Sequence, residues 1–106
     1  MKMLTKEILE EFKKQGSTDG KKPEEVKIIC KFFNPTGRGT WYATEFNEQE
    51  RLFFGFVSLF GDSCDELGYF SLDELQALRL PLGLSIERDL NFGVHYLKEV
   101  LEGARP

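Results

Sequence analysis

The sequence has 106 residues, of which 41% are hydrophobic and 30% charged, with a formal net charge of −4. This composition excludes a disordered chain, and the length predicts a single domain with one hydrophobic core over residues 1–106. No apolar run approaches the roughly 20 residues needed to cross a bilayer, so we expect no membrane association. Cys30 and Cys64 are too few for a disulfide framework, which favours a reduced, cytoplasmic protein.

Residues 1–22 are predicted to form an amphipathic helix followed by a polar loop. Thr5 can cap the start of the helix, and Gly16 follows its lysine-rich last turn. One apolar stripe would dock this helix on the rest of the domain, and it consists of Leu4, Ile8, Leu9 and Phe12.

The apolar residues change to a period of two at Val26, which predicts that residues 26–92 form a sheet. Asn34 and Pro35 end the first strand because Pro35 has no backbone donor, and the glycines that follow suit a turn into a second strand over 40–46. One face of the first strand would be formed by Val26, Ile28, Cys30 and Phe32.

The third predicted strand, residues 52–60, is apolar on both of its faces. An antiparallel strand with one solvated face should alternate apolar and polar side chains, and this strand does not. Either helices cover both faces of the sheet, or one face is an interface with a partner.

The remaining elements follow in the second half of the chain. Ser71 and Glu74 form a capping box that opens a helix of about two turns. Residues 84–92 alternate as a further strand, and residues 94–102 form a final amphipathic helix. The predicted fold class is therefore α+β, a mostly antiparallel four- to five-stranded sheet with N-terminal, internal and C-terminal helices.

The sheet region also carries a resemblance to a known family. The segments that carry it are residues 31–46, Leu67-Gly68-Tyr69, Ser71-Leu72-Asp73-Glu74-Leu75 and Leu84-Ser85-Ile86-Glu87-Arg88-Asp89-Leu90. From Val26 to Phe92 the chain resembles the domain-of-unknown-function family 2958, which occurs in phage, plasmid and conjugative-element proteins. The resemblance implies a protein of a mobile genetic element, and it names no chemistry.

Our first functional interpretation is a small, acidic, non-enzymatic protein-interaction module. The setting of the family, sometimes beside anti-restriction domains, implies a counter-defence inhibitor of the anti-restriction or anti-CRISPR type. Its protein partner would be a host nuclease or a CRISPR effector, and its carboxylates would compete with nucleic-acid phosphates for a basic groove. A homodimer is a further alternative. The candidate partner-binding residues are Asp62, Asp65, Glu66, Asp73, Glu74, Tyr42 and Phe46.

The alternative interpretation is a nucleic-acid-binding domain. Sheets that bind single strands combine exposed aromatic rings for stacking with basic side chains for phosphates. The strand-turn-strand region offers both kinds of residue, namely Lys27, Lys31, Arg38, Trp41 and Tyr42. The same aromatic residues could equally form the core, and the chain as a whole is acidic.

Glu87, Arg88 and Asp89 form the sharpest charged triplet of the sequence. On a strand, Arg88 would share a face with apolar residues, where its guanidinium must find acceptors. It would therefore be either a structural arginine or a cation aimed at an anionic group in a pocket. An enzyme that uses this triplet or His95 is the less favoured interpretation, and we assign no catalytic residue.

No cofactor or metal is expected from the sequence. The acidic loop at residues 62–66 lacks the spacing of a calcium loop. Cys64 and His95 show no arrangement typical of a zinc site or of an activated cysteine.

Overall fold

A five-stranded antiparallel sheet forms the centre of the structure, in the order β5-β4-β3-β2-β6. The computed structural model describes residues 2–60 and 64–106. The strands of the central sheet are β2 (Cys30–Phe33), β3 (Thr40–Asn47), β4 (Leu52–Ser58), β5 (Glu66–Ser71) and β6 (Glu87–Arg88). Two short strands form a second antiparallel pair, β1 (Lys27–Ile28) and β7 (His95–Tyr96). The predicted α+β class is confirmed.

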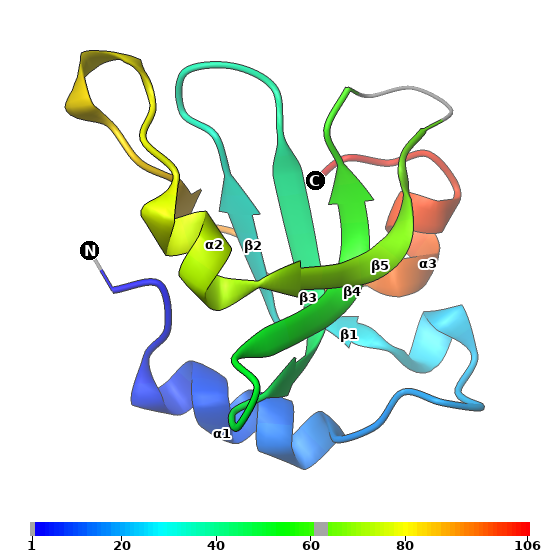
Figure 1. Ribbon diagram of the computed structural model, residues 1–106. Helices are drawn as coiled ribbons and strands as arrows, with labels where there is room; N and C mark the ends of the chain where they lie inside the picture. The colour runs from blue at the N-terminus through cyan, green and yellow to red at the C-terminus, as the bar shows by residue number, and fades with distance from the viewer. Residues whose placement is uncertain (1, 61–63) are drawn as a thin grey trace.

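Helices cover both faces of the sheet (Figure 1). The helices are α1 (Lys6–Gln15), α2 (Leu72–Ala77) and α3 (Leu97–Leu101), with 3₁₀ turns at Pro23–Glu25 and Pro81–Gly83. We call the face that α1 and α2 cover face A, and the face that α3 covers face B. Helices cover both faces along most of the third predicted strand, whereas Leu59 and Phe60 at its end are exposed. No helix in the described part of the chain is long and apolar enough to cross a membrane.

The helix ends follow the capping signals of the sequence. The Thr5 hydroxyl accepts a hydrogen bond from the Ile8 backbone amide at 3.2 Å, and α1 ends at Gly16, whose φ of 60° favours glycine. The Ser71 hydroxyl accepts from the Glu74 amide at 3.2 Å and begins α2. Both predicted helix starts are confirmed.

Face A carries an aromatic core centred on Phe53 of β4. Its ring is fully buried, and it lies 4.6 Å from the ring of Phe46, 5.1 Å from Phe70, 5.2 Å from Phe32 and 5.9 Å from Phe12 between centroids. Rings at these separations and tilts contribute beyond the area they bury. Phe12 comes from α1, so this cluster is also what docks the helix on the sheet.

The first strand differs from its prediction. Val26 and Ile28 pack in the face B core, whereas Cys30 and Phe32 pack in the face A core, so the expectation of one common face was wrong. The strand breaks at Ile29, whose amide donates to the Ala43 carbonyl at 2.8 Å, beside a bulge at residue 44 of β3. Ile29 and Cys30 both pack in the face A core, so the side-chain alternation of this segment reverses at its own break.

The last predicted strand and helix are shorter than the sequence indicated. Only Glu87 and Arg88 pair with β2, because the Asp89 carboxylate accepts from the Asn91 amide at 2.9 Å and turns the chain away. The final helix begins at Leu97 rather than at residue 94, since the two residues before it are paired with β1.

Candidate functional site

The acidic residues predicted to form a partner-binding cluster lie apart from one another. Glu66 begins β5, whereas Asp73 and Glu74 lie in the first turn of α2, so roughly 17 Å of strand separates the two groups. The Asp65 side chain is only 3% exposed, and Asp62 lies outside the described residues. The described carboxylates therefore do not form one acidic surface.

The two aromatic residues proposed beside them pack inside the protein. Tyr42 is 1% exposed and lies among Phe56, Phe92 and α3 in the face B core. Phe46 is partly buried against the face A core. The ring of Tyr42 is therefore a core element, and the prediction that it extends an exposed aromatic surface was wrong.

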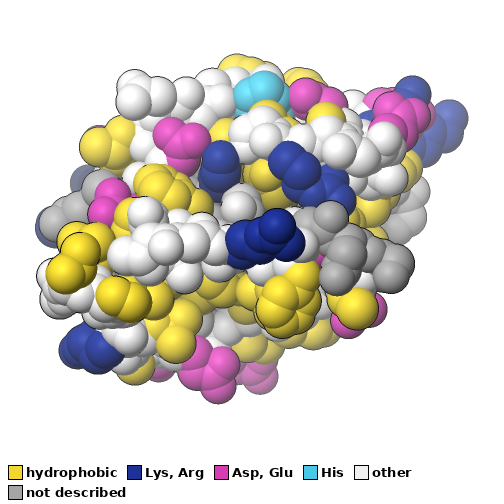
Figure 2. Space-filling model, turned by 90° about the horizontal axis from the view of Figure 1, so that it is seen from above, with side chains coloured by type: hydrophobic (Ala, Val, Ile, Leu, Met, Phe, Trp, Pro, Cys, Tyr) yellow, Lys and Arg dark blue, Asp and Glu magenta, His cyan; other side chains and the backbone are white. Residues whose placement is uncertain are grey.

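Basic side chains gather where β2 turns into β3. A hollow of about 460 Å³ opens on face B at this end of the sheet, and its described lining includes three cations and no carboxylate. We call it the basic hollow, with its cations Lys31, Arg38 and Arg105. Seen from above, Figure 2 shows Lys and Arg side chains in the middle of this end of the molecule and most Asp and Glu side chains toward its rim.

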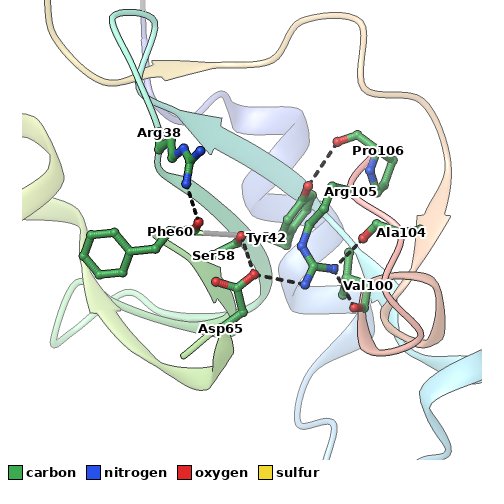
Figure 3. Close-up of polar contacts among 9 residues, drawn as sticks. All are labelled: Arg38, Tyr42, Ser58, Phe60, Asp65, Val100, Ala104, Arg105 and Pro106. Carbon is green, nitrogen blue, oxygen red and sulfur yellow. Dashed lines mark hydrogen bonds and ion pairs between the residues drawn. The ribbon is translucent and has the colours of Figure 1, made fainter. Parts of the chain in front are cut away.

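Arg38 is held at the tip of the β2–β3 turn. Asn34 closes the turn. Its side-chain oxygen accepts from the Thr36 backbone amide at 2.8 Å, and its backbone amide donates to the Gly39 carbonyl at 2.9 Å. The Arg38 guanidinium donates to the Phe60 carbonyl at 2.9 Å (Figure 3) and makes no ion pair with any described residue. Most of its five N–H donors are therefore available to an anion.

Lys31 projects from β2 into the base of the hollow. Its ammonium group donates to the Pro106 carbonyl at 2.8 Å and lies 3.6 Å from the Asp89 carboxylate. The Tyr42 hydroxyl donates to the same carbonyl at 3.2 Å (Figure 3). Burial raises the pKa of Tyr42 to about 12, against a smaller opposing effect of Arg105, so this hydroxyl is a neutral donor at physiological pH.

Arg105 forms the wall of the hollow opposite Arg38. One guanidinium nitrogen lies 3.0 Å from the Asp65 carboxylate, and another donates to the Val100 carbonyl at 2.8 Å (Figure 3). The guanidinium also lies over the ring of Phe56, at 4.9 Å from its centroid. Two of the three cations thus have a carboxylate beside them, and the described hollow keeps a net positive charge that comes mainly from Arg38.

The structure brings together only part of the predicted nucleic-acid set. Lys31 and Arg38 line the hollow, and the Tyr42 hydroxyl lies beneath it. Lys27 pairs with Glu11 of α1 at 3.1 Å, far along the sheet, and Trp41 packs against the face A core. No local signal in the sequence could have added Arg105, because it meets the turn only through the fold.

The charged triplet divides between the two faces of the sheet. Arg88 points to face A and donates to the Met3 carbonyl at 3.4 Å, which fits the structural interpretation. Asp89 pairs with Lys31, and Glu87 borders a separate hollow of about 300 Å³. His95 contacts Glu99 at 2.9 Å, and this hydrogen bond lowers the pKa of the Glu99 carboxyl.

Metal-binding side chains are not clustered in the described part of the chain. No three His, Cys, Asp or Glu residues there come together around a common point. Cys30 is buried, and burial strongly raises the pKa of its thiol, which leaves it neutral and unreactive in the native state.

The comparison with known families covers nearly the whole chain. The family model described as "Protein of unknown function (DUF2958)" matches residues 3–105, including the N-terminal helix and the C-terminal segment outside the predicted region of resemblance. The chain belongs to this family. A search of curated proteins and a search of solved structures found no match. Membership of DUF2958 identifies a shared fold without a described activity.

Proposed function

We propose that this DUF2958 protein is a non-enzymatic binding module and that the basic hollow binds the phosphate backbone of a single-stranded nucleic acid. The observation that carries the proposal is the lining of the hollow, with three cations and no carboxylate among its described residues in a chain of net charge −4. Cations concentrated in one cleft attract phosphates even when the remaining surface is acidic.

The arrangement favours binding over catalysis. The described polar side chains that line the hollow are cations, hydroxyls and a turn amide, and the carboxylates of Asp65 and Asp89 lie behind them, paired with Arg105 and Lys31. General acid–base and nucleophilic catalysis most often use histidine, cysteine or carboxylate groups within hydrogen-bonding reach of a substrate, and the lining groups that could replace them, Lys31 and Ser58, are bonded to the protein itself. A positively charged hollow that lacks histidine, cysteine and carboxylate side chains in its described lining is suited to holding an anion.

The test is the affinity of the purified protein for a fluorescently labelled single-stranded oligonucleotide, measured by anisotropy over a range of salt concentrations. Log K should fall with log[salt] with a slope between about −0.7, for one neutralised phosphate, and about −2, for one phosphate at each of the three cations. Arg38→Glu should weaken binding by at least about tenfold, because it removes the least compensated cation and adds a negative charge.

Lys14→Glu is the matched control for this substitution. It makes the same change in net charge on an exposed residue of α1, at the other end of the sheet from the hollow (Figure 1). It should reduce affinity only slightly. Absence of binding at low salt, or equal losses in Arg38→Glu and Lys14→Glu, would contradict the proposal.

A second candidate function is the protein-interaction module of a mobile element, acting as a counter-defence inhibitor of a host nuclease or CRISPR effector. One observation supports it. β5 is an edge strand of the sheet, and it presents Tyr69 at 71% exposure and Leu67 at 41% on face B. Long edge strands are usually guarded by lysine, proline or a bulge, and β5 has none of these.

The direct test of this second candidate is DNA cleavage by purified restriction nucleases and CRISPR effectors in the presence of the protein. Inhibition should be lost in Tyr69→Lys, which places a charge on the exposed edge, and kept in Leu82→Lys, at another exposed site. Equal inhibition by the two variants would show that the β5 edge is not the surface that binds the partner.

A further inference from the structure

The basic hollow has an exposed aromatic residue, Phe60, next to its least compensated cation. The hydrogen bond from the Arg38 guanidinium to the Phe60 carbonyl, 2.9 Å long, holds these two residues together from different strand ends. Phe60 is 58% exposed, and Figure 3 shows its ring extending away from the Asp65–Arg105 pair. The Phe60 main chain thus lies against Arg38, and its exposed ring extends outward from the rim of the hollow.

The dimensions of the hollow suit a small ligand. Its volume of about 460 Å³ falls within the range of roughly 300 to 1,000 Å³ that is typical of small-molecule sites. A volume of this size can hold one nucleotide unit, and it is too small for a folded nucleic-acid segment.

The polar side chains of the lining are largely committed to the protein itself. The Asn34 side-chain oxygen accepts from Thr36, and its nitrogen donates to the Arg38 carbonyl at 3.4 Å. The Ser58 hydroxyl donates to Asp65 at 2.7 Å. Groups engaged in this way are poorly placed to read the hydrogen-bonding edge of a base. A base would therefore mainly contact the aromatic rings of the lining, which are Phe33 beside Lys31 and the more exposed Phe60.

We propose that the basic hollow is a one-nucleotide site: it binds a nucleoside monophosphate unit, with the phosphate on the Arg38 guanidinium and the base stacked on Phe60. Lys31 and Arg105 supply positive potential from the base and wall of the hollow. This inference rests on the proposed nucleic-acid function and adds the ligand unit and the residue that holds its base. Because stacking is indifferent to base identity, purine and pyrimidine nucleotides bind with similar affinity.

The experiment is a titration of ¹⁵N-labelled protein followed by amide chemical shifts, with thymidine monophosphate, adenosine monophosphate, thymidine and inorganic phosphate as separate ligands. Both nucleotides should shift the amides of the β2–β3 turn and have dissociation constants within about fivefold of each other. Thymidine and inorganic phosphate each offer one half of the contact and should bind more weakly.

The deciding variant is Phe60→Ala. It should weaken nucleotide binding by about 5- to 160-fold, the range that corresponds to loss of one base–aromatic stack, and leave inorganic phosphate binding unchanged. Tyr69→Ala is the matched control, since it removes an aromatic ring that is 71% exposed and lies outside the lining. Arg38→Glu should weaken binding of both phosphate-bearing ligands.

The outcomes separate this inference from the function on which it rests. If the oligonucleotide binds through Arg38 but thymidine monophosphate does not bind, or if Phe60→Ala equals Tyr69→Ala, the one-nucleotide site is wrong and the proposed function stands. If neither nucleotide nor oligonucleotide binds at low salt, both are wrong. Thermal unfolding of each variant verifies that it is folded, which is expected because both rings are exposed.

Discussion

The two faces of the sheet are built from alternate residues of the same strands, yet they differ in what they leave open. Face A is closed by α1 and α2 over a continuous set of phenylalanine rings. Face B is closed only where α3 packs on Tyr42 and Phe56, and beyond that point it opens into the basic hollow. Face A therefore stabilises the fold, and the uncovered end of face B is available to a ligand.

This difference follows from the lengths of the covering helices. A two-faced apolar strand must be covered on both sides, and α3 has five residues where α1 has ten. A short helix protects a short stretch of strand, so polar residues are accommodated on face B past the end of α3. We infer that changes on face A should alter stability, and changes at the open end of face B should mainly alter binding.

The largest effect should come from Gly55→Ala, which disrupts the close contact between β3 and β4, the two strands that contribute to both faces. An added Cβ at Gly55 would lie 1.8 Å from the Tyr42 carbonyl oxygen, so β3 and β4 would have to separate. We expect a loss of about 5 kcal/mol or more in the free energy of unfolding, which approaches the whole stability of such a domain. Circular dichroism with urea denaturation measures it.

Gly68→Ala is the matched control for that change. Gly68 pairs with Gly55 in the neighbouring strand, but an added Cβ there meets nothing within 4 Å. Its effect should remain within about 0.5 kcal/mol. Similar losses in the two variants would show that the strand contact at Gly55 is not what holds the faces together.

Next in size is Phe53→Ala, which tests the role of face A directly. Removing this buried ring leaves a cavity among four other rings and should cost roughly 3 to 5 kcal/mol. Leu67→Ala on face B, where the side chain is 41% exposed, should cost less than about 1 kcal/mol. If the two losses were alike in urea denaturation, the stabilising role of face A would be rejected.

A smaller effect on the free energy of unfolding is expected at alkaline pH, from the ionisation of Tyr42 on face B. The pKa of Tyr42 is raised by burial to about 12, so its neutral form stabilises the native state fully below pH 10, and this contribution is lost as the pH rises toward 12. The free energy of unfolding should therefore fall by up to about 1.4 kcal/mol per pH unit between pH 10 and 12 from this residue.

Tyr42→Phe should remove that part of the alkaline loss, while its stability at pH 7 falls by about 1 kcal/mol because the hydrogen bond to Pro106 is gone. Tyr69→Phe leaves Tyr42 in place and should behave like the parent protein. An identical alkaline loss in the parent and in Tyr42→Phe would mean that this hydroxyl is not closed off from water.

Local signals predicted the local structure well. Thr5 and Ser71 cap their helices as expected, because a cap needs only residues three positions apart. The alternation over residues 26–32 predicted the wrong face for part of the segment, because the strand breaks at Ile29, where its amide donates to the Ala43 carbonyl of a strand more than ten residues later. The hydrophobic pattern of one segment does not show which strand will pair with it or in which register.

Sequence patterns predicted only part of the candidate site. Lys31 and Arg38 could be linked because they flank one predicted turn, whereas Arg105 reaches them only through the packing of α3 and the segment after it. The acidic residues give the converse lesson, since closeness along the chain did not make Asp65, Glu66 and Asp73 a surface. β5 runs between them, and a strand carries its two ends apart.

The sequence by itself determined the fold class, the starts of two helices and the presence of one strand that is apolar on both faces. These features depend on periodicity and capping, which involve residues close together in the chain and can be recognised as patterns in the sequence. Only the tertiary structure decided which aromatic rings were buried, which carboxylates were separated and where three cations met. Such properties depend on contacts between distant segments, and their geometry is fixed by packing the whole core at once.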